Sequence, residues 1–186
     1  MIEETRSHRP RRSGLTTGIL ILTVFASLWA TLGISVIPGG MAVTAASVVL
    51  AAGFIAATIF FSLRSQPAEP DDRDENAATG NYRSFGLINF AQTVAIFVSL
   101  VILGRIGQWA LVPPVVCLIV GLHFLPLART FGEPRYRWAG TLMTAVSLAG
   151  ILVFAADAGA GAVRAVVGFG AALVLWATAL RMARHR

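Results

Sequence analysis

The chain has 186 residues, of which 56% are hydrophobic and 13% are charged. A soluble domain carries about a quarter charged residues, so the composition argues against a soluble globular protein. The formal net charge is +6 at pH 7, but the arginines stand at the borders of long apolar runs and not on one polar face. This pattern excludes a nucleic-acid-binding surface and makes membrane lipids the expected partner.

A polar, basic segment at residues 1–14 precedes six long apolar runs. Crossing a hydrocarbon core of about 30 Å takes about 20 helical residues, which is close to the length of each run. The alternating pattern of barrel strands is absent. We therefore predict an all-α integral membrane bundle of six transmembrane helices in one domain, residues 15–182, with a cytoplasmic tail at residues 183–186. The predicted helices cover about 15–37, 41–63, 85–103, 109–128, 139–156 and 162–180.

Arginine gathers in alternate connectors of this chain. The first, third and fifth predicted helices are followed by short turns, whereas residues 64–84 and 129–138 form longer, basic connectors. With the N-terminus inside, 13 of the 15 basic residues lie on the inner side, and only Arg105 and Arg164 lie on the outer side. An excess of arginine in short loops marks the cytoplasmic side. We therefore predict three hairpins in the cell (plasma or inner) membrane, with the N- and C-termini cytoplasmic.

The strongest polar residues inside the predicted helices gather at one depth. His123 lies six residues before Arg129, and Asn89 lies six residues after Arg83. At a rise of about 1.5 Å per residue, both lie about 9 Å from the cytoplasmic border. Gln92 is one turn deeper on the same face as Asn89. Because helices 85–103 and 109–128 form an antiparallel hairpin, we predict a candidate polar intramembrane cluster of Asn89, Gln92 and His123.

Two interpretations of this cluster stay open. Histidine titrates near physiological pH, which favours a proton- or ligand-responsive site. The alternative is an interhelical hydrogen bond worth about 1 kcal/mol or less. Pro126 lacks the N–H that would bond the Leu122 carbonyl, so we predict a helix break there. We expect the His123 ring to point into the bundle and to reach Asn89, Gln92 or a hydroxyl of helix 139–156.

Serine and threonine recur in stripes along several predicted helices, as at Thr141, Thr144 and Ser147. Small hydroxyl residues favour close helix packing and bond the carbonyl of the preceding turn. A polar permeation path is the alternative. The sequence has no catalytic, phosphate-binding or metal-binding pattern, and the lone Cys117 forms neither an intrachain disulfide nor a metal site. We predict no catalytic residues, no enzyme activity, no metal and no cofactor.

One stretch carries a resemblance: Gly121-Leu122-His123-Phe124-Leu125-Pro126-Leu127-Ala128-Arg129, followed by Phe131, Pro134, Tyr136 and Gly140. It resembles a G-L-H-F-x-P-L-A signature of small uncharacterised bacterial multi-pass (six-helix) membrane proteins. The resemblance implies an integral membrane protein and brings no established activity. The expected function is that of a non-enzymatic structural or accessory membrane protein, with another membrane protein or a second copy as partner. The alternative is a small-solute transporter or channel that uses the polar cluster.

Overall fold

The computed structural model describes residues 12–37, 45, 75–131 and 134–184, without the side chains of 12–17, 19, 75–84 and 131. These residues contain helices and turns and no strand, which confirms the all-α class for the described part of the chain. The predicted helix 41–63 lies outside the described residues, apart from Ala45. The elements are α1 (Arg12–Ile34), α3 (Glu75–Arg105), the 3₁₀ turn η1 (Trp109–Leu111), α4 (Val112–Phe131), α5 (Pro134–Ala155) and α6 (Gly159–Arg184).

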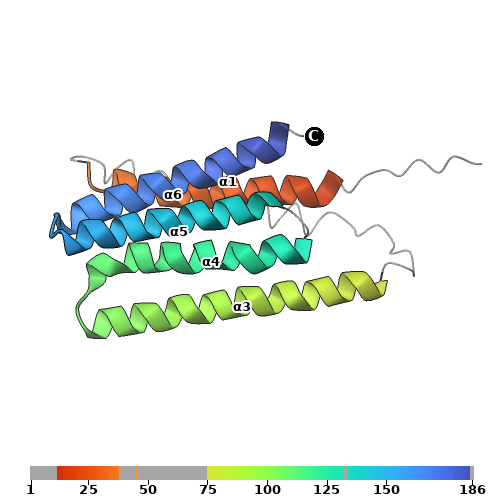
Figure 1. The fold of residues 1–186 in the computed structure, drawn as a ribbon, viewed down its shortest axis with the longest axis horizontal. Coiled ribbons are helices and arrows are strands. Elements are labelled where there is room, and N and C mark those ends of the chain that lie inside the picture. The colour runs from red at the N-terminus through yellow and green to blue at the C-terminus, as the bar shows by residue number, and fades with distance from the viewer. Residues whose placement is uncertain (1–11, 38–44, 46–74, 132–133, 185–186) are drawn as a thin grey trace, which may run out of the picture.

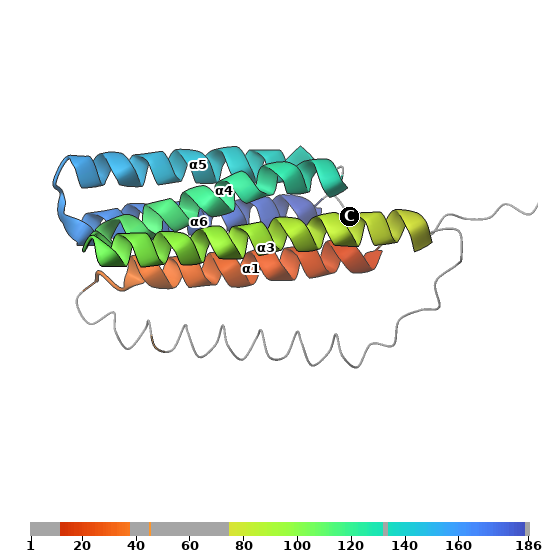
Figure 2. The same ribbon diagram turned by 90° about the horizontal axis from the view of Figure 1, so that it is seen from below.

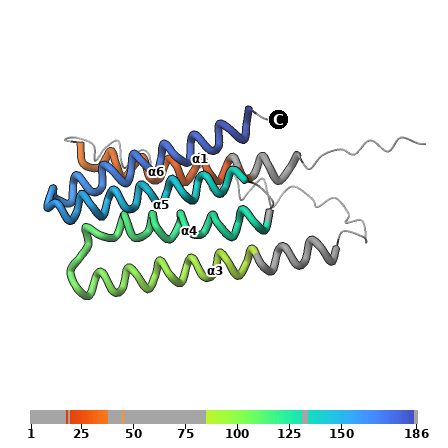
Figure 3. The backbone as a smooth tube through the Cα atoms, in the orientation of Figure 1, coloured from red at the N-terminus to blue at the C-terminus, as the bar shows by residue number. Residues whose placement is uncertain are grey.

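The long helices lie side by side in an elongated bundle (Figures 1 and 2). α4 packs between α3 and α5, and α6 packs between α5 and α1. The same order can be followed along the Cα trace (Figure 3). Successive helices from α3 to α6 alternate in direction, while α1 and α3 run the same way (Figure 1). α3 therefore lies at one edge of the bundle, with α4 as its main neighbour.

Four of these helices are long and apolar enough to cross a membrane. They correspond to the last four predicted helices, and α1 contains a shorter apolar stretch, Leu20–Ile34. The count of six helices and the arrangement as three hairpins stay predictions. The four candidate spans are Phe85–Arg105, Trp109–Thr130, Pro134–Ala155 and Gly159–Arg184.

The helices extend further than the apolar runs. α3 begins at Glu75, where we predicted a start at 85, and α6 ends at Arg184, where we predicted an end at 180. Backbone hydrogen bonds between residues four apart hold a helix together, whereas hydropathy marks only the part that prefers hydrocarbon. A helix therefore continues into polar sequence beyond the apolar run.

Glycines set the closest approaches between helices. A Cβ atom added at Gly168 of α6 would lie 2.8 Å from the Cα atom of Gly33 in α1. One added at Gly140 of α5 would lie 2.7 Å from the carbonyl oxygen of Gly121 in α4. Both neighbours are backbone atoms, which cannot turn aside as a side chain does. Small residues of this kind let membrane helices pack closely.

Ser147 also connects α5 to α4. Its Oγ atom donates a hydrogen bond of 2.7 Å to the carbonyl oxygen of Pro114, and its side chain is 0% exposed. In the same interface the thiol of Cys117 donates to the carbonyl of Met143 over 3.4 Å. Both bonds join neighbouring helices, in contrast to the other hydroxyl bonds described below.

Ser147→Ala should weaken the contact between α4 and α5. The substitution removes the donor to the Pro114 carbonyl, and such bonds in membrane proteins contribute about 1 kcal/mol or less. We expect a loss of about that size in the free energy of unfolding, measured by denaturant titration in detergent. Ser99→Ala is the control, because Ser99 bonds only Ala95 in its own helix. An equal loss in both variants would contradict a specific role for the interhelical bond.

Candidate functional site

His123 lies on α4 and faces α3. Its imidazole lies beside the backbone of Ile88 in α3, and its Nδ1 atom is buried and has no hydrogen-bond partner among the described residues. The N–H of a residue in mid-helix is already used by the helix, so the carbonyl of Ile88 is the backbone group open to the imidazole.

Asn89 and Gln92 lie on α3 close to this contact. Asn89 is the next residue after Ile88, and Gln92 follows Ile88 by one turn. Both residues are half-buried, as is His123. Within the described part of the chain no hydrogen bond joins either amide to the imidazole. The three predicted residues thus lie at one level of the α3–α4 pair, but the group beside the imidazole is the main chain of Ile88, which we did not predict.

The surroundings of His123 on the α4–α5 side are aromatic. Phe124 lies edge-on to the imidazole, with 6.0 Å between ring centroids. Phe124 in turn stacks on Tyr136 of α5, with centroids 5.8 Å apart and 22° between the planes. Phe124 is buried. The ring of His123 therefore lies between an apolar α4–α5 interface and the backbone of α3.

Pro126 lies inside α4, and the local break that we predict at the Leu122 carbonyl stays a prediction. The helix runs through Pro126 to Phe131. Proline removes one donor from the helix, but the bonds on either side remain. The hydroxyl of Thr130 also donates to the Pro126 carbonyl over 3.1 Å, within the same helix.

Most hydroxyl groups of the helices donate to the backbone of their own helix. Thr31 and Thr144, for example, bond the carbonyls of Ser27 and Gly140, each one turn earlier, at 2.9 Å. A hydroxyl used in this way has no proton left to donate to a solute, although its oxygen can still accept a hydrogen bond. The same pattern holds for Ser27, Ser35, Thr93, Ser99, Thr130, Thr141 and Thr178.

The chemistry open to this site is limited to hydrogen bonding and proton binding. An imidazole that donates through Nε2 offers Nδ1 to a hydroxyl, an ammonium or a water molecule. Among the described residues no three His, Cys, Asp or Glu side chains lie close enough together to hold a metal ion. Asn89 and Gln92 add amides, which bind without changing charge.

His123→Leu should loosen the bundle modestly, and His123→Asn should largely preserve it. Leucine has no N–H donor for the Ile88 carbonyl, whereas asparagine keeps a polar N–H group at this position. We expect the leucine variant to lose about 1 kcal/mol or less of unfolding free energy. Thermal unfolding of both variants in the same detergent measures this difference. A leucine variant as stable as the wild type, or an asparagine variant equally destabilised, would show that the hydrogen bond contributes nothing.

Comparison with known proteins adds no assignment to this site. No family model matches the chain, no curated protein is similar to it, and no solved structure matches it. The resemblance of residues 121–140 to small bacterial multi-pass membrane proteins therefore stays a prediction. The class that the described fold defines is an all-helical protein with several apolar helices of membrane-crossing length.

Proposed function

We propose that the chain is a non-enzymatic integral membrane protein that acts as a structural or accessory component of the cell membrane. The observation that carries this proposal is the way in which the hydroxyl groups of the helices form hydrogen bonds. The hydroxyls of α1, α3, α5 and α6 donate to helix carbonyls, and the helices meet at glycines. Such helices are built to pack against one another and against lipid, with another membrane protein or a second copy as the expected partner.

The proposed architecture has six crossings with both termini cytoplasmic. α1 and α3 run in the same direction (Figures 1 and 2), so α3 begins at the end of the bundle where α1 also begins. The apolar run 41–63 has the length for a crossing that returns the chain to this end. Of the arginines with described side chains, most lie at the ends of α4 and α6 and the start of α5, which favours that end as the cytoplasmic one.

Reporter fusions test this topology. A fluorescent protein that folds only in the cytoplasm should be active when inserted in residues 64–84 or attached after Arg186. A phosphatase that folds only outside should be active in the turn at residues 157–161. Phosphatase activity from residues 64–84 would overturn the proposed orientation.

A transporter or channel is the second candidate function, and the unpartnered Nδ1 atom of His123 favours it. A buried acceptor without a donor can bind a solute hydroxyl or ammonium group. Flux of small polar solutes into liposomes that contain the purified protein distinguishes the two candidates. Flux no faster than in empty liposomes supports a structural role. Flux that His123→Asn or Asn89→Leu abolishes would replace that proposal with the transporter.

A further inference from the structure

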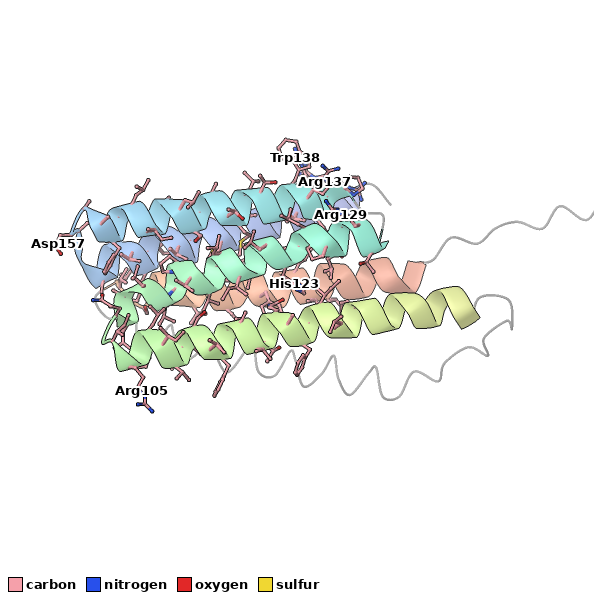
Figure 4. The ribbon with its side chains drawn as sticks, turned by 60° about the horizontal axis from the view of Figure 1, so that its bottom comes forward. Arg105, His123, Arg129, Arg137, Trp138 and Asp157 are labelled. Carbon is pink, nitrogen blue, oxygen red and sulfur yellow. The ribbon has the colours of Figure 1, made fainter. Side chains whose placement is uncertain are left out.

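Most of the charged side chains that the structure describes lie at one end of the bundle. The opposite end carries Arg105, Arg164 and Asp157. Figure 4 shows Arg129, Arg137 and Trp138 at the first end and Arg105 and Asp157 at the other. Among residues with described side chains, the arginines of the first end are Arg129, Arg135, Arg137, Arg181 and Arg184.

Arg129 and Arg137 lie at the adjoining ends of a packed helix pair. Arg129 is in the last turn of α4, Arg137 is near the start of α5, and both side chains are exposed. Trp138 follows directly and is 63% exposed. The sequence between the two helices contains one carboxylate, Glu133, so residues 129–138 keep a positive net charge.

Exposed leucines continue from these arginines along the same two helices. Leu122 and Leu125 precede Arg129 by seven and four residues, so all three lie on one face of α4. Leu142 follows Trp138 by four residues on α5, and all three leucines are exposed. Along the bundle axis, α4 therefore changes from a guanidinium group to aliphatic side chains, and α5 changes from an indole ring to an aliphatic side chain.

We propose that this end of the α4–α5 pair binds a phospholipid with an anionic headgroup. The planar guanidinium groups of Arg129 and Arg137 suit phosphate oxygens, which they contact in pairs. The indole of Trp138 prefers the level of the headgroups, and Leu122, Leu125 and Leu142 contact the acyl chains. A free phosphate would leave these leucines uncovered. A whole lipid has a charged headgroup followed by acyl chains, which matches arginine followed by leucine. The proposal rests on the proposed membrane location of the chain.

Lipid binding by the purified full-length chain in a neutral detergent tests the proposal. The probes are dioleoylphosphatidylglycerol, dioleoylphosphatidylcholine and inorganic phosphate, and native mass spectrometry counts the lipid that is retained. The wild type should bind phosphatidylglycerol in preference to phosphatidylcholine, and inorganic phosphate should not compete. Arg129→Gln with Arg137→Gln should weaken phosphatidylglycerol binding about 30-fold, since each basic residue near a lipid surface contributes roughly 1 kcal/mol.

The matched control is Arg105→Gln with Arg164→Gln, which removes the same charge from the other end and should bind like the wild type. Either single substitution, Arg129→Gln or Arg137→Gln, should weaken binding about fivefold, which gives a readout if the double variant does not fold. Equal binding of the two lipids, full competition by phosphate, or equal loss in the control would each overturn the proposal. Retention of the wild type in alkali-washed membranes tests the membrane location separately.

Discussion

Gly168→Val should separate α1 from α6 and destabilise the protein more than any other single substitution considered. The new Cβ atom would lie 2.8 Å from both the Cα atom of Gly33 and the carbonyl oxygen of Trp29. Both are backbone atoms of α1, so the helix itself has to move. Overpacking typically costs about 1–3 kcal/mol, and we expect at least the upper end of that range. Denaturant titration in detergent measures the change in unfolding free energy.

Gly161→Val is the matched control on the same helix. A Cβ atom at Gly161 would meet nothing within 4 Å. Both substitutions place valine in α6, so the cost in intrinsic helix propensity is shared. A control variant as unstable as Gly168→Val would mean that valine disturbs α6 by itself, and that the approach of Gly33 is not the cause.

Four long apolar helices could be predicted from the sequence because hydropathy and helix length are local properties. A run such as 109–128 needs no knowledge of its neighbours to be recognised, since hydrocarbon thickness alone sets its length. The pairing of Gly168 with Gly33 is different. The chain has 18 glycines, and which of them meet depends on the rotation and register of both helices. Those quantities come from packing between helices distant in sequence.

The level of His123 relative to α3 could be predicted from the sequence, whereas the group that it contacts could not. Counting residues from Arg129 and Arg83 placed His123 level with Asn89, and the imidazole does reach the residue before it, Ile88. A backbone carbonyl has two lone pairs and can accept a side-chain bond in addition to its helix bond. Every residue has such a carbonyl, so the sequence does not show which carbonyl a side chain will contact.

Pro126 lies inside α4, which runs from Val112 to Phe131. The predicted helix 109–128 also runs through this residue, although proline costs about 3 kcal/mol in the interior of a soluble helix. The length of the apolar run therefore predicted the course of α4 better than the helix propensity of this single residue.

Gly140→Val should open the interface between α4 and α5. Its Cβ atom would lie 2.7 Å from the carbonyl oxygen of Gly121 and 3.2 Å from the Cβ atom of Phe124. The first neighbour is backbone, so α4 has to move away. We expect a loss of about 2–3 kcal/mol in unfolding free energy.

Cys117 gives a direct measurement of this opening, because it is the only cysteine of the chain. Its side chain is 0% exposed, and its thiol bonds the Met143 carbonyl across the α4–α5 interface. Maleimide should therefore label Cys117 slowly in the wild type and much faster in Gly140→Val. Gly86→Val is the control, since a Cβ atom there meets nothing within 4 Å. Labelling that stays slow in Gly140→Val would show that α4 and α5 accommodate the valine without separating, and that close approach at Gly121 is not what holds this interface together.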